Sequence, residues 1–449
     1  MHRSRLLIVV AAMIVLAACQ SDSSDPRDDV AAPGGSTPVA QSDQPANVST
    51  LTPYPVPTPS DVDAPSGFEP VFAQFVARHG ARSLTGGEPL EDVIALWEEA
   101  EQADALTETG RRFGPDARAL YTAMKEVGFG ELNTLGAEEM RGIGKREGKR
   151  LATLFEDAPG EGAKVEMVHS GKSRAEDSAR MFGKGLGSVH PELAIEPPEE
   201  NENLLKFDNE NDEYEDFLDG DAWKPDYYKV RRLSKIDAAA VDALEHLFTP
   251  SFVAGIDEPL YYGNAVFDVY RAGPSMSRDV NVDTTRLMPK DAAAAYAYVE
   301  DARFFYRRGP GVEGDDSTYQ AAQILLDDFF EVIDDRLEGR GSHPHAAVYR
   351  FAHAEEITPF AAMLELPGSD EQGKPGEAFT LENNDFRVST VAPLSANIGW
   401  TVWQKNDTNI VSVRYNEVPT TIGRDCQPYE GTKNFYELDE LRSCLGATG

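Results

Sequence analysis

The sequence predicts an α/β fold, in which an open sheet has helices on both faces and a mainly helical cap is inserted into the chain. Two observations support this prediction. Strand-like and helix-like segments alternate on either side of a central region that contains helices alone. With 449 residues, of which 41% are hydrophobic, the chain is also long enough to bury a large core. We therefore expect an α/β core from residues 67–195 and 341–449, and a cap from 196–340.

Three strand-helix units define the expected core. Each strand is a short apolar run that contains β-branched or aromatic residues, and each is followed by a helical segment. The strands are expected at 71–77, 164–169 and 346–352, and the helices at 88–103, 174–186 and 354–364. Two alternating segments that flank Asn406-Asp407, at 399–404 and 409–415, indicate a β-hairpin.

The expected cap differs from the core in both charge and pattern. It opens with a very acidic stretch at 199–221 and continues with helical segments. These helical segments are expected at 237–247, 291–306 and 317–337. Because no strand interrupts them, they are typical of an inserted helical subdomain.

The N-terminus has the pattern of a targeting segment. Arg3 and Arg5 precede an apolar run at 6–18, which is too short to span a bilayer comfortably but suits the core of a signal peptide. The run ends in Leu-Ala-Ala-Cys at 16–19, which resembles a bacterial lipobox. That resemblance implies cleavage before Cys19, lipidation of its thiol, and a cell-envelope lipoprotein that faces the exterior or the periplasm. A plain signal peptide with an incidental cysteine is the alternative.

The segment after the signal peptide has the composition of a linker. Residues 20–66 contain nine prolines and many Ser, Asp and Ala residues, with few large apolar ones. We expect a disordered tether over these residues, followed by ordered structure from about Phe68. The tether would hold a catalytic body away from the membrane.

The three cysteines fit an exported chain. An odd number of cysteines leaves one thiol without a disulfide partner in an oxidising compartment. If Cys19 carries lipid, however, Cys426 and Cys444 remain to pair. A disulfide that closes a loop of this size could stabilise the C-terminal segment by about 3 kcal/mol.

The formal net charge of −35 argues against nucleic acid as a partner, because phosphate backbones need a basic surface. A small phosphorylated substrate remains possible, since only its pocket must be positive. Clustered arginines can supply that charge inside an acidic shell. The excess of acidic residues is otherwise typical of a soluble, self-repelling surface.

Arginines and histidines gather where the three expected strands end. The junctions carry Arg78, His79 and Arg82, then His169, Lys172 and Arg174, then His353 and Glu355. Ligands of an open α/β sheet bind at the carboxyl ends of the strands, and the amide groups of the following helices favour an anion there. If the three strands are neighbours, these side chains converge on one site. A single phosphate group is its natural ligand.

These residues carry a resemblance to a known family. Arg78-His79-Gly80-x-Arg82 matches the signature of the histidine phosphatase superfamily, which implies a phosphoglycerate-mutase-like sheet. His353-Ala354-Glu355 replaces the usual His-Asp pair and resembles the multiple inositol-polyphosphate phosphatase branch, as does the whole string at 351–360. The resemblance extends from about residue 68 to about residue 445. Ser83 is a departure, because relatives often have proline nearby.

The resemblance implies a role for each of these residues. His79 is the nucleophile that becomes a phosphohistidine, and Glu355 is the general acid for the leaving oxygen. The phosphoryl oxygens are held by Arg78, Arg82, Arg174 and His353. Arginine forks suit phosphate oxygens, and a ring of such donors can replace a metal ion, so no metal or organic cofactor is expected.

Several side chains have an alternative interpretation. Glu356 lies next to Glu355 and could be the acid, although either carboxylate could simply favour the helix dipole. His169 is equally compatible with a pocket role and a structural one. His343-Pro344-His345 could bind a metal, but no third ligand is evident, and we reject it as a metal site.

Substrate class depends on cations beyond the catalytic arginines. Phytate carries six phosphates, and the candidates for binding them are Lys172, Arg231 and Arg232. The basic cluster at 224–235 could equally pair with the acidic stretch before it. The arginines at 303, 307 and 308 are expected to decorate a helix.

We therefore predict a secreted phosphomonoesterase that acts on inositol polyphosphates, including phytate, and that is tethered to the membrane by lipid. One alternative is a general histidine acid phosphatase with another phosphomonoester substrate. An alternative of a different class is a lipoprotein that binds phosphorylated ligands without turnover.

Overall fold

The computed structural model describes residues 48–58, 63–207, 211–340 and 344–446. The expected signal peptide at 1–19, with Cys19, and the first part of the expected linker lie outside the described residues. Within the described residues, no helix combines the length and the apolarity needed to cross a bilayer.

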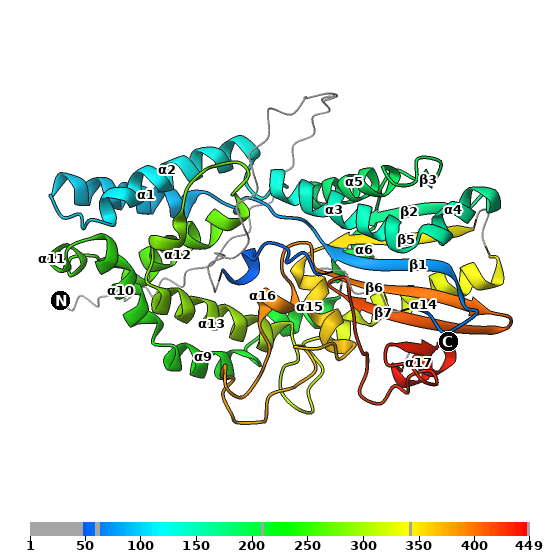
Figure 1. Cartoon of the computed structure of the whole chain (residues 1–449). Coiled ribbons are helices and arrows are strands. Elements are labelled where there is room, and N and C mark those ends of the chain that lie inside the picture. Colours follow the sequence, from blue (N-terminus) through cyan, green and yellow to red (C-terminus); the bar gives the residue numbers. More distant parts are fainter. Residues whose placement is uncertain (1–47, 59–62, 208–210, 341–343, 447–449) are drawn as a thin grey trace, which may run out of the picture. The chain divides into compact units, whose positions relative to one another are not determined.

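A mixed sheet forms the centre of the α/β part (Figure 1). Its order is β3-β2-β5-β1-β6-β7-β8, with β4 paired to β2 and β9 paired to β7. The strands are β1 (Glu69–Arg78), β2 (Lys164–His169), β3 (Ala194–Ile195), β4 (Glu199–Glu200), β5 (His345–Ala352), β6 (Asn397–Lys405), β7 (Thr408–Tyr415), β8 (Val418–Pro419) and β9 (Phe435–Glu437).

Strands β1, β2 and β5 are parallel neighbours, so their carboxyl ends meet at one edge. Arg78 pairs with Ala352, and His169 pairs with Phe351. Strands β6 and β7 form the expected antiparallel hairpin, whose turn has Asn406 at a φ of 53°. The α/β fold class predicted from the sequence is confirmed.

The central strands are buried on both faces, which explains their nearly continuous apolar sequence. In β1, Phe72 and Val76 belong to the hydrophobic core on one face, whereas Phe75 and Ala77 belong to the core on the other face. The two faces are therefore covered by different sets of helices.

Helices α3 (Thr134–Arg150), α4 (Ala152–Glu161) and α5 (Ser173–Gly187) cover one face. Helices α3 and α5 pack very closely, because a Cβ atom on Gly185 would lie 2.2 Å from the carbonyl oxygen of Arg141. Helices α14 (Gln323–Glu338) and α15 (Ala354–Met363) cover the other face.

A second group of helices packs around its own core, at the left of Figure 1. These helices are α1 (Glu88–Gln102), α2 (Gly110–Val127), α10 (Ile236–Leu247), α12 (Pro259–Ser275) and α13 (Lys290–Arg307). The expected cap at 196–340 differs from this group at both ends. It omits α1 and α2, and it includes α14, which packs on the sheet. An amphipathic pattern shows that a helix has an apolar face but does not show which partner covers it.

Shorter elements complete the described chain. They are α6 (Glu202–Leu205), α8 (Asp212–Asp219), α9 (Lys224–Leu233), α11 (Pro250–Val253), α16 (Val388–Val391), α17 (Leu438–Cys444), and the 3-10 turns η2 (Ser49–Leu51), η3 (Thr284–Arg286) and η4 (Gln320–Ala322).

Ordered structure begins earlier than residue 67, which corrects the expected extent of the linker. The side chains of Val48, Leu51 and Tyr54 are buried, and the carbonyl of Thr52 accepts a hydrogen bond from Leu394 N at 2.9 Å. The polar, proline-rich composition of the whole stretch conceals these few apolar residues, which follow neither a helical nor a strand period.

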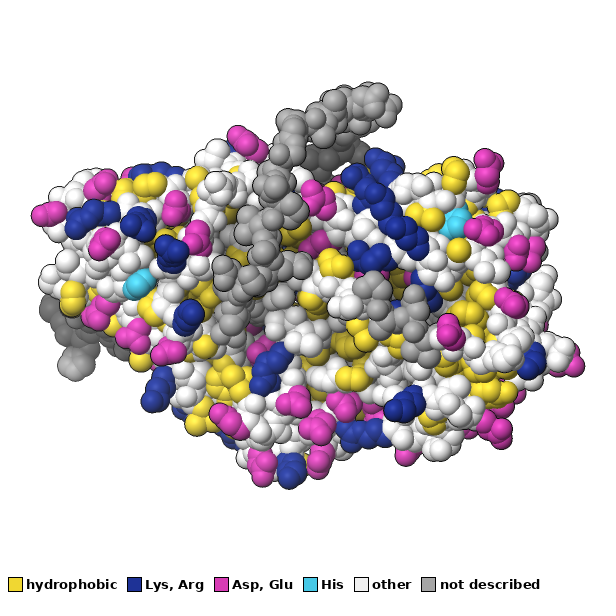
Figure 2. Space-filling view, viewed as in Figure 1, with side chains coloured by type: hydrophobic (Ala, Val, Ile, Leu, Met, Phe, Trp, Pro, Cys, Tyr) yellow, Lys and Arg dark blue, Asp and Glu magenta, His cyan; other side chains and the backbone are white. Residues whose placement is uncertain are grey.

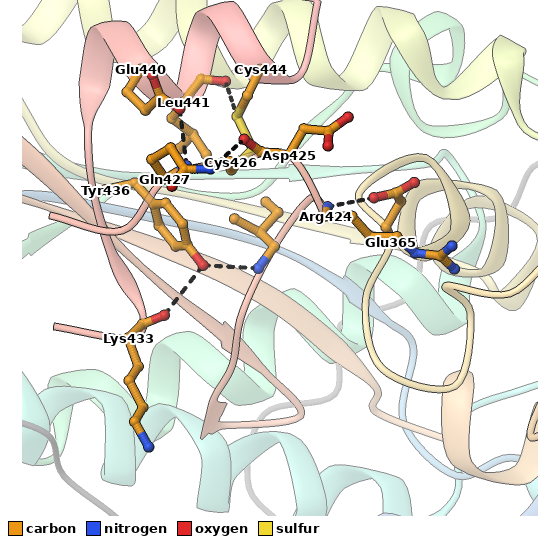
Figure 3. The surroundings of a disulfide bond; sticks show 11 residues. Glu365, Arg424, Asp425, Cys426, Gln427, Lys433, Tyr436, Glu440, Leu441 and Cys444 are labelled. Atoms are coloured by element: carbon orange, nitrogen blue, oxygen red, sulfur yellow. Dashed lines mark hydrogen bonds between the residues drawn. A yellow bond between two sulfur atoms is a disulfide. The ribbon is translucent and has the colours of Figure 1, made fainter.

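The expected disulfide between Cys426 and Cys444 is present, with Cα atoms 5.2 Å apart (Figure 3). It fastens α17 to the loop that follows β8. Beside it, the carboxylate of Glu440 accepts a hydrogen bond from Gln427 N, and that of Glu365 accepts one from Arg424 N. The disulfide therefore joins two segments that are also held by side-chain contacts.

Candidate active site

The three strand-helix junctions lie together at the carboxyl edge of the sheet. The rings of His79 and His353 are 5.4 Å apart, and Arg174 Nη2 lies 3.2 Å from His353 Nδ1. Arg78, His79 and His353 are buried. The structure thus brings together side chains from β1, α5 and the start of α15.

The loop that carries His79 packs backbone to backbone against the start of α3. A Cβ atom on Gly80 would lie 2.6 Å from the carbonyl oxygen of Gly136, and one on Gly136 would lie 2.2 Å from that of Ala81. Glycine is therefore required on both sides of this contact. The hydroxyl of Ser178 accepts a hydrogen bond from Gly80 N at 3.0 Å and fixes the loop further.

The hydrogen bonding of His79 sets its tautomer. Its Nδ1 lies 2.9 Å from the carbonyl oxygen of Gly80, which can only accept, so Nδ1 carries the proton. Nε2 then keeps its lone pair. Burial, followed by the charges of Arg174 and Arg78, lowers the pKa of His79 well below its usual range. His79 is consequently a neutral imidazole with a nucleophilic Nε2.

Three arginines surround this imidazole with donors. Burial and the neighbouring guanidinium groups lower the pKa of Arg78 to about 10 and that of Arg82 to about 9, so both stay charged at neutral pH. Among the described residues, the buried Nε atoms of Arg78, Arg82 and Arg174 have no hydrogen-bond partner. Because unpaired buried donors are costly, an anion with several oxygens would stabilise this arrangement.

His353 holds Arg174 in place. A guanidinium can only donate, so His353 Nδ1 accepts from Arg174, and Nε2 carries the proton that it donates to Ser170 Oγ at 2.7 Å. Burial and then the charge of Arg174 lower the pKa of His353 to about 3. Both ring nitrogens are therefore used within the protein. A direct bond from His353 to phosphate would require one of these two contacts, with Ser170 or with Arg174, to break.

The two adjacent acids have different surroundings. The Glu356 carboxylate is fully buried and accepts a hydrogen bond from His353 N at 3.0 Å, which stabilises the first turn of α15. Burial favours the neutral form of Glu355, but Arg308, then His353 and Arg78, outweigh it and lower its pKa to about 2. Glu356 thus acts in the helix start, and Glu355 lies among the charges of the site.

Arg308 corrects one expectation, because it does not decorate a helix. It is only 9% exposed and gives Glu355 its strongest favourable charge interaction. Helix α13 ends at Arg307, so Arg308 leaves the helical period and turns inward. The sequence signal that could have found it is Gly309-Pro310, a helix-stop pattern placed directly after it.

A cavity of about 610 Å³ lies between α9, α12 and α13. It is lined by Arg231 and by Arg271, which pairs with Asp268 at 2.7 Å and with Glu300 at 3.8 Å. The charge of Arg271 also contributes to the lowered pKa of Arg82, and Glu355 interacts electrostatically with Glu300. Arg271 and Glu300, which line the cavity, are therefore close enough to the catalytic cluster to interact with its charges.

The other cations expected to bind substrate lie elsewhere. Lys172 is exposed at the start of α5, and Arg232 is exposed and does not line the cavity. Within the basic cluster at 224–235, Lys224 pairs with Asp221, and Lys229 pairs with a neighbouring aspartate. Pairing with the acidic stretch before the cluster, one of its two expected roles, applies to Lys224, whereas the partner of Lys229 is Asp226, inside the cluster.

The remaining histidines and acids do not form a metal site among the residues that the structure describes. His343 lies outside them, and His345 Nδ1 lies 3.3 Å from the carboxylate of Glu166. His169 Nδ1 accepts a hydrogen bond from Gly171 N at 3.1 Å, which is a structural contact within the turn.

Figure 2 shows acidic and basic side chains interspersed on the visible face.

Comparison with known proteins agrees with the site. The family model described as the histidine phosphatase superfamily (branch 2) matches residues 71–416. The chain belongs to this superfamily. This histidine phosphatase is similar to the solved multiple inositol polyphosphate phosphatase of Bifidobacterium longum in complex with inositol hexasulfate. The TM-score is 0.80 and the identity 27%, over 89% of this chain and 97% of that chain.

The same Bifidobacterium longum enzyme in complex with phosphate is 25% identical, with a TM-score of 0.80 over 89% of this chain and 97% of that chain. The phytase from D. castellii shares the fold at 13% identity, with a TM-score of 0.58 over 89% of this chain and 85% of that chain. No curated protein matches this histidine phosphatase. Family and fold together identify the protein as a phosphatase.

Proposed function

We propose that this phosphatase hydrolyses inositol polyphosphates, including phytate, through a phosphohistidine at His79. The observation that carries the proposal is the neutral imidazole, with its unprotonated Nε2, among three arginines whose buried Nε atoms lack partners in the described structure. The 27% identical multiple inositol polyphosphate phosphatase of Bifidobacterium longum, solved in complex with inositol hexasulfate, supports the choice of substrate class.

The first step transfers the phosphoryl group to the protein. His79 Nε2 attacks phosphorus while the bond to the ester oxygen breaks, and Glu355 gives its proton to the departing alkoxide. The charges of Arg78 and Arg174 stabilise the negative oxygens of the transition state. In the second step, water attacks the phosphohistidine and Glu355 takes the proton of that water. Inorganic phosphate and the free imidazole result.

Glu355 must gain a proton before it can act as an acid, because its pKa is about 2 without substrate. A phosphate ester that enters as a monoanion carries such a proton. Its negative charge also offsets the neighbouring arginines, so the pKa of Glu355 rises when the ester binds. The proton can then move from the substrate to Glu355. On this basis kcat/KM should follow the monoanion and fall above the second phosphate pKa, which is about 6.

The test is to incubate the purified protein with phytate and with p-nitrophenyl phosphate, and to measure phosphate release from each. The proposal expects a higher kcat/KM for phytate and a series of lower inositol phosphates as products. A higher kcat/KM for the aryl ester would favour a general acid phosphatase. Binding of phytate without release of phosphate would indicate a ligand-binding lipoprotein, and the pairing of His79 with Glu355 speaks against that outcome.

We also propose export and lipid anchoring at Cys19, with the protein facing the exterior or the periplasm. The support is the signal-peptide pattern and the Leu-Ala-Ala-Cys sequence at 16–19. Labelled fatty acid fed to expressing cells should be incorporated into the native chain and not into Cys19→Ala. Equal labelling of both chains would contradict lipidation at this residue.

A further inference from the structure

The first described residues of the chain lie against the catalytic loop and do not behave as a tether. Val48 and Leu51 are buried in the core of the helical group, and Tyr54 is buried in the core that α3 and α5 form on the sheet. In Figure 1 the dark blue turn η2 lies beside α16, between these two parts of the structure. We refer to residues 48–54 as the N-terminal strap.

The strap contacts the catalytic arginine directly. Arg78 Nη1 donates to the carbonyl oxygen of Thr50 at 2.8 Å and to that of Ala392 at 2.6 Å. The strap therefore supplies one of the two backbone acceptors that orient this guanidinium, and the hydrogen bond from Leu394 N to Thr52 O holds both acceptor segments together. Movement of the strap would remove one of the two acceptors that orient the Arg78 side chain.

One buried carboxylate joins the strap to the nucleophile loop. Glu139, on α3, accepts hydrogen bonds from Tyr54 N at 2.9 Å, from Ala81 N at 2.9 Å and from Ser395 Oγ at 2.8 Å. Ser395 N in turn donates to the carbonyl oxygen of His79 at 3.0 Å. A single side chain thus fixes segments that approach His79 from three directions.

Three donors to one carboxylate require its two oxygens to act as acceptors. An amide in the same place has one oxygen and an NH2 group, and the NH2 group would face an N–H or hydroxyl donor. These three hydrogen bonds tie Glu139 to the protein itself, and we assign it no role as acid, base or ligand. Its hydrogen bonds are those of a residue that positions the strap and the loop that carries His79.

We propose that Glu139 and the N-terminal strap are the positioning device that holds Arg78 and His79 in the reactive arrangement. The strap is then part of the catalytic body, although the sequence marks it as linker. This inference rests on the proposed phosphoryl transfer to His79. It applies to any phosphomonoester, because the same transfer precedes release of every alcohol.

The test compares Glu139→Gln with Glu138→Gln on p-nitrophenyl phosphate. Glu138 is the adjacent residue on α3, is exposed, and pairs with Arg278 at 2.9 Å, so it is a matched control. In folded Glu139→Gln, kcat should fall about 100-fold while KM changes by less than about threefold, because misplacement affects the transition state more than binding. Glu138→Gln should keep kcat within about twofold.

Two further variants separate positioning from folding. Glu139→Asp keeps a carboxylate and should recover part of the lost kcat. Ser395→Ala removes one donor while Glu139 stays in place, and should lower kcat about tenfold while the thermal midpoint falls by only about 4 °C or less. If Glu139→Gln does not fold, Ser395→Ala decides alone. Native kcat in Ser395→Ala or in folded Glu139→Gln would overturn the inference. Since the aryl ester is the substrate, failure to cleave phytate leaves this test valid.

Discussion

Replacing Arg308 by Gln should raise the pKa of the Glu355 carboxyl. Burial favours the neutral form, but Arg308, followed by His353 and Arg78, lowers the pKa from 4.5 to about 2. Each pKa unit corresponds to about 1.4 kcal/mol, so this lowering favours the carboxylate by about 3 kcal/mol. Arg308 makes the largest contribution to it, and its loss should raise the pKa by at least about one unit.

Infrared difference spectra between each protein and its Glu355→Gln counterpart would report the titration of this one carboxyl. The ionised band of the native protein should persist to about pH 3, because the pKa is about 2. In Arg308→Gln the midpoint should move to higher pH, whereas Arg308→Lys keeps a positive charge and should stay close to native. A native midpoint at or above 4.5 would refute the reasoning.

Glu355, His353 and the disulfide each give one further prediction. Glu355→Gln should lower kcat/KM for phytate at least about 100-fold, because its leaving group is a poorly stabilised inositol alkoxide. The loss of kcat/KM for p-nitrophenyl phosphate, which releases the more stable nitrophenolate, should be smaller. Equal losses for both substrates would contradict the role of Glu355 as general acid. The free energy of unfolding should fall as pH falls from 6.5 to about 3, because His353 takes up a proton in the unfolded chain but not in the folded one. In urea titrations, the free energy of unfolding of His353→Asn should fall less steeply over this pH range than that of the native protein. Cys426→Ser should destabilise the protein by about 3 kcal/mol, and an unchanged urea midpoint would contradict this.

The sequence predicted the parts of the site that lie at the ends of regular elements. Arg78 and His79 end or follow a strand, and Arg174 and Glu355 lie in first helical turns, so an apolar run followed by a helix located all four. Parallel strands that share an edge then bring their carboxyl ends together. The neighbouring arrangement of β1, β2 and β5 could be expected once each unit had been recognised.

Glu139 could not be located from the sequence, because its contacts join segments far apart in the chain. Glu139 meets Tyr54 and Ser395, which are 85 and 256 residues away. No local period or motif records such contacts. Arg308 turns inward only because α13 ends one residue earlier. The packing of α1 and α2 with α12 could not be predicted from the sequence pattern either, because an amphipathic helix does not specify its partner.

Rapid quenching of the protein with p-nitrophenyl phosphate, followed by peptide mass spectrometry at neutral or alkaline pH, tests the central claim most directly. The account predicts one phosphoryl group on the imidazole of His79, formed at the rate of the nitrophenol burst and absent from His79→Ala. Turnover by His79→Ala at the native rate, or a phosphoryl group on a different residue in the native protein, would contradict it.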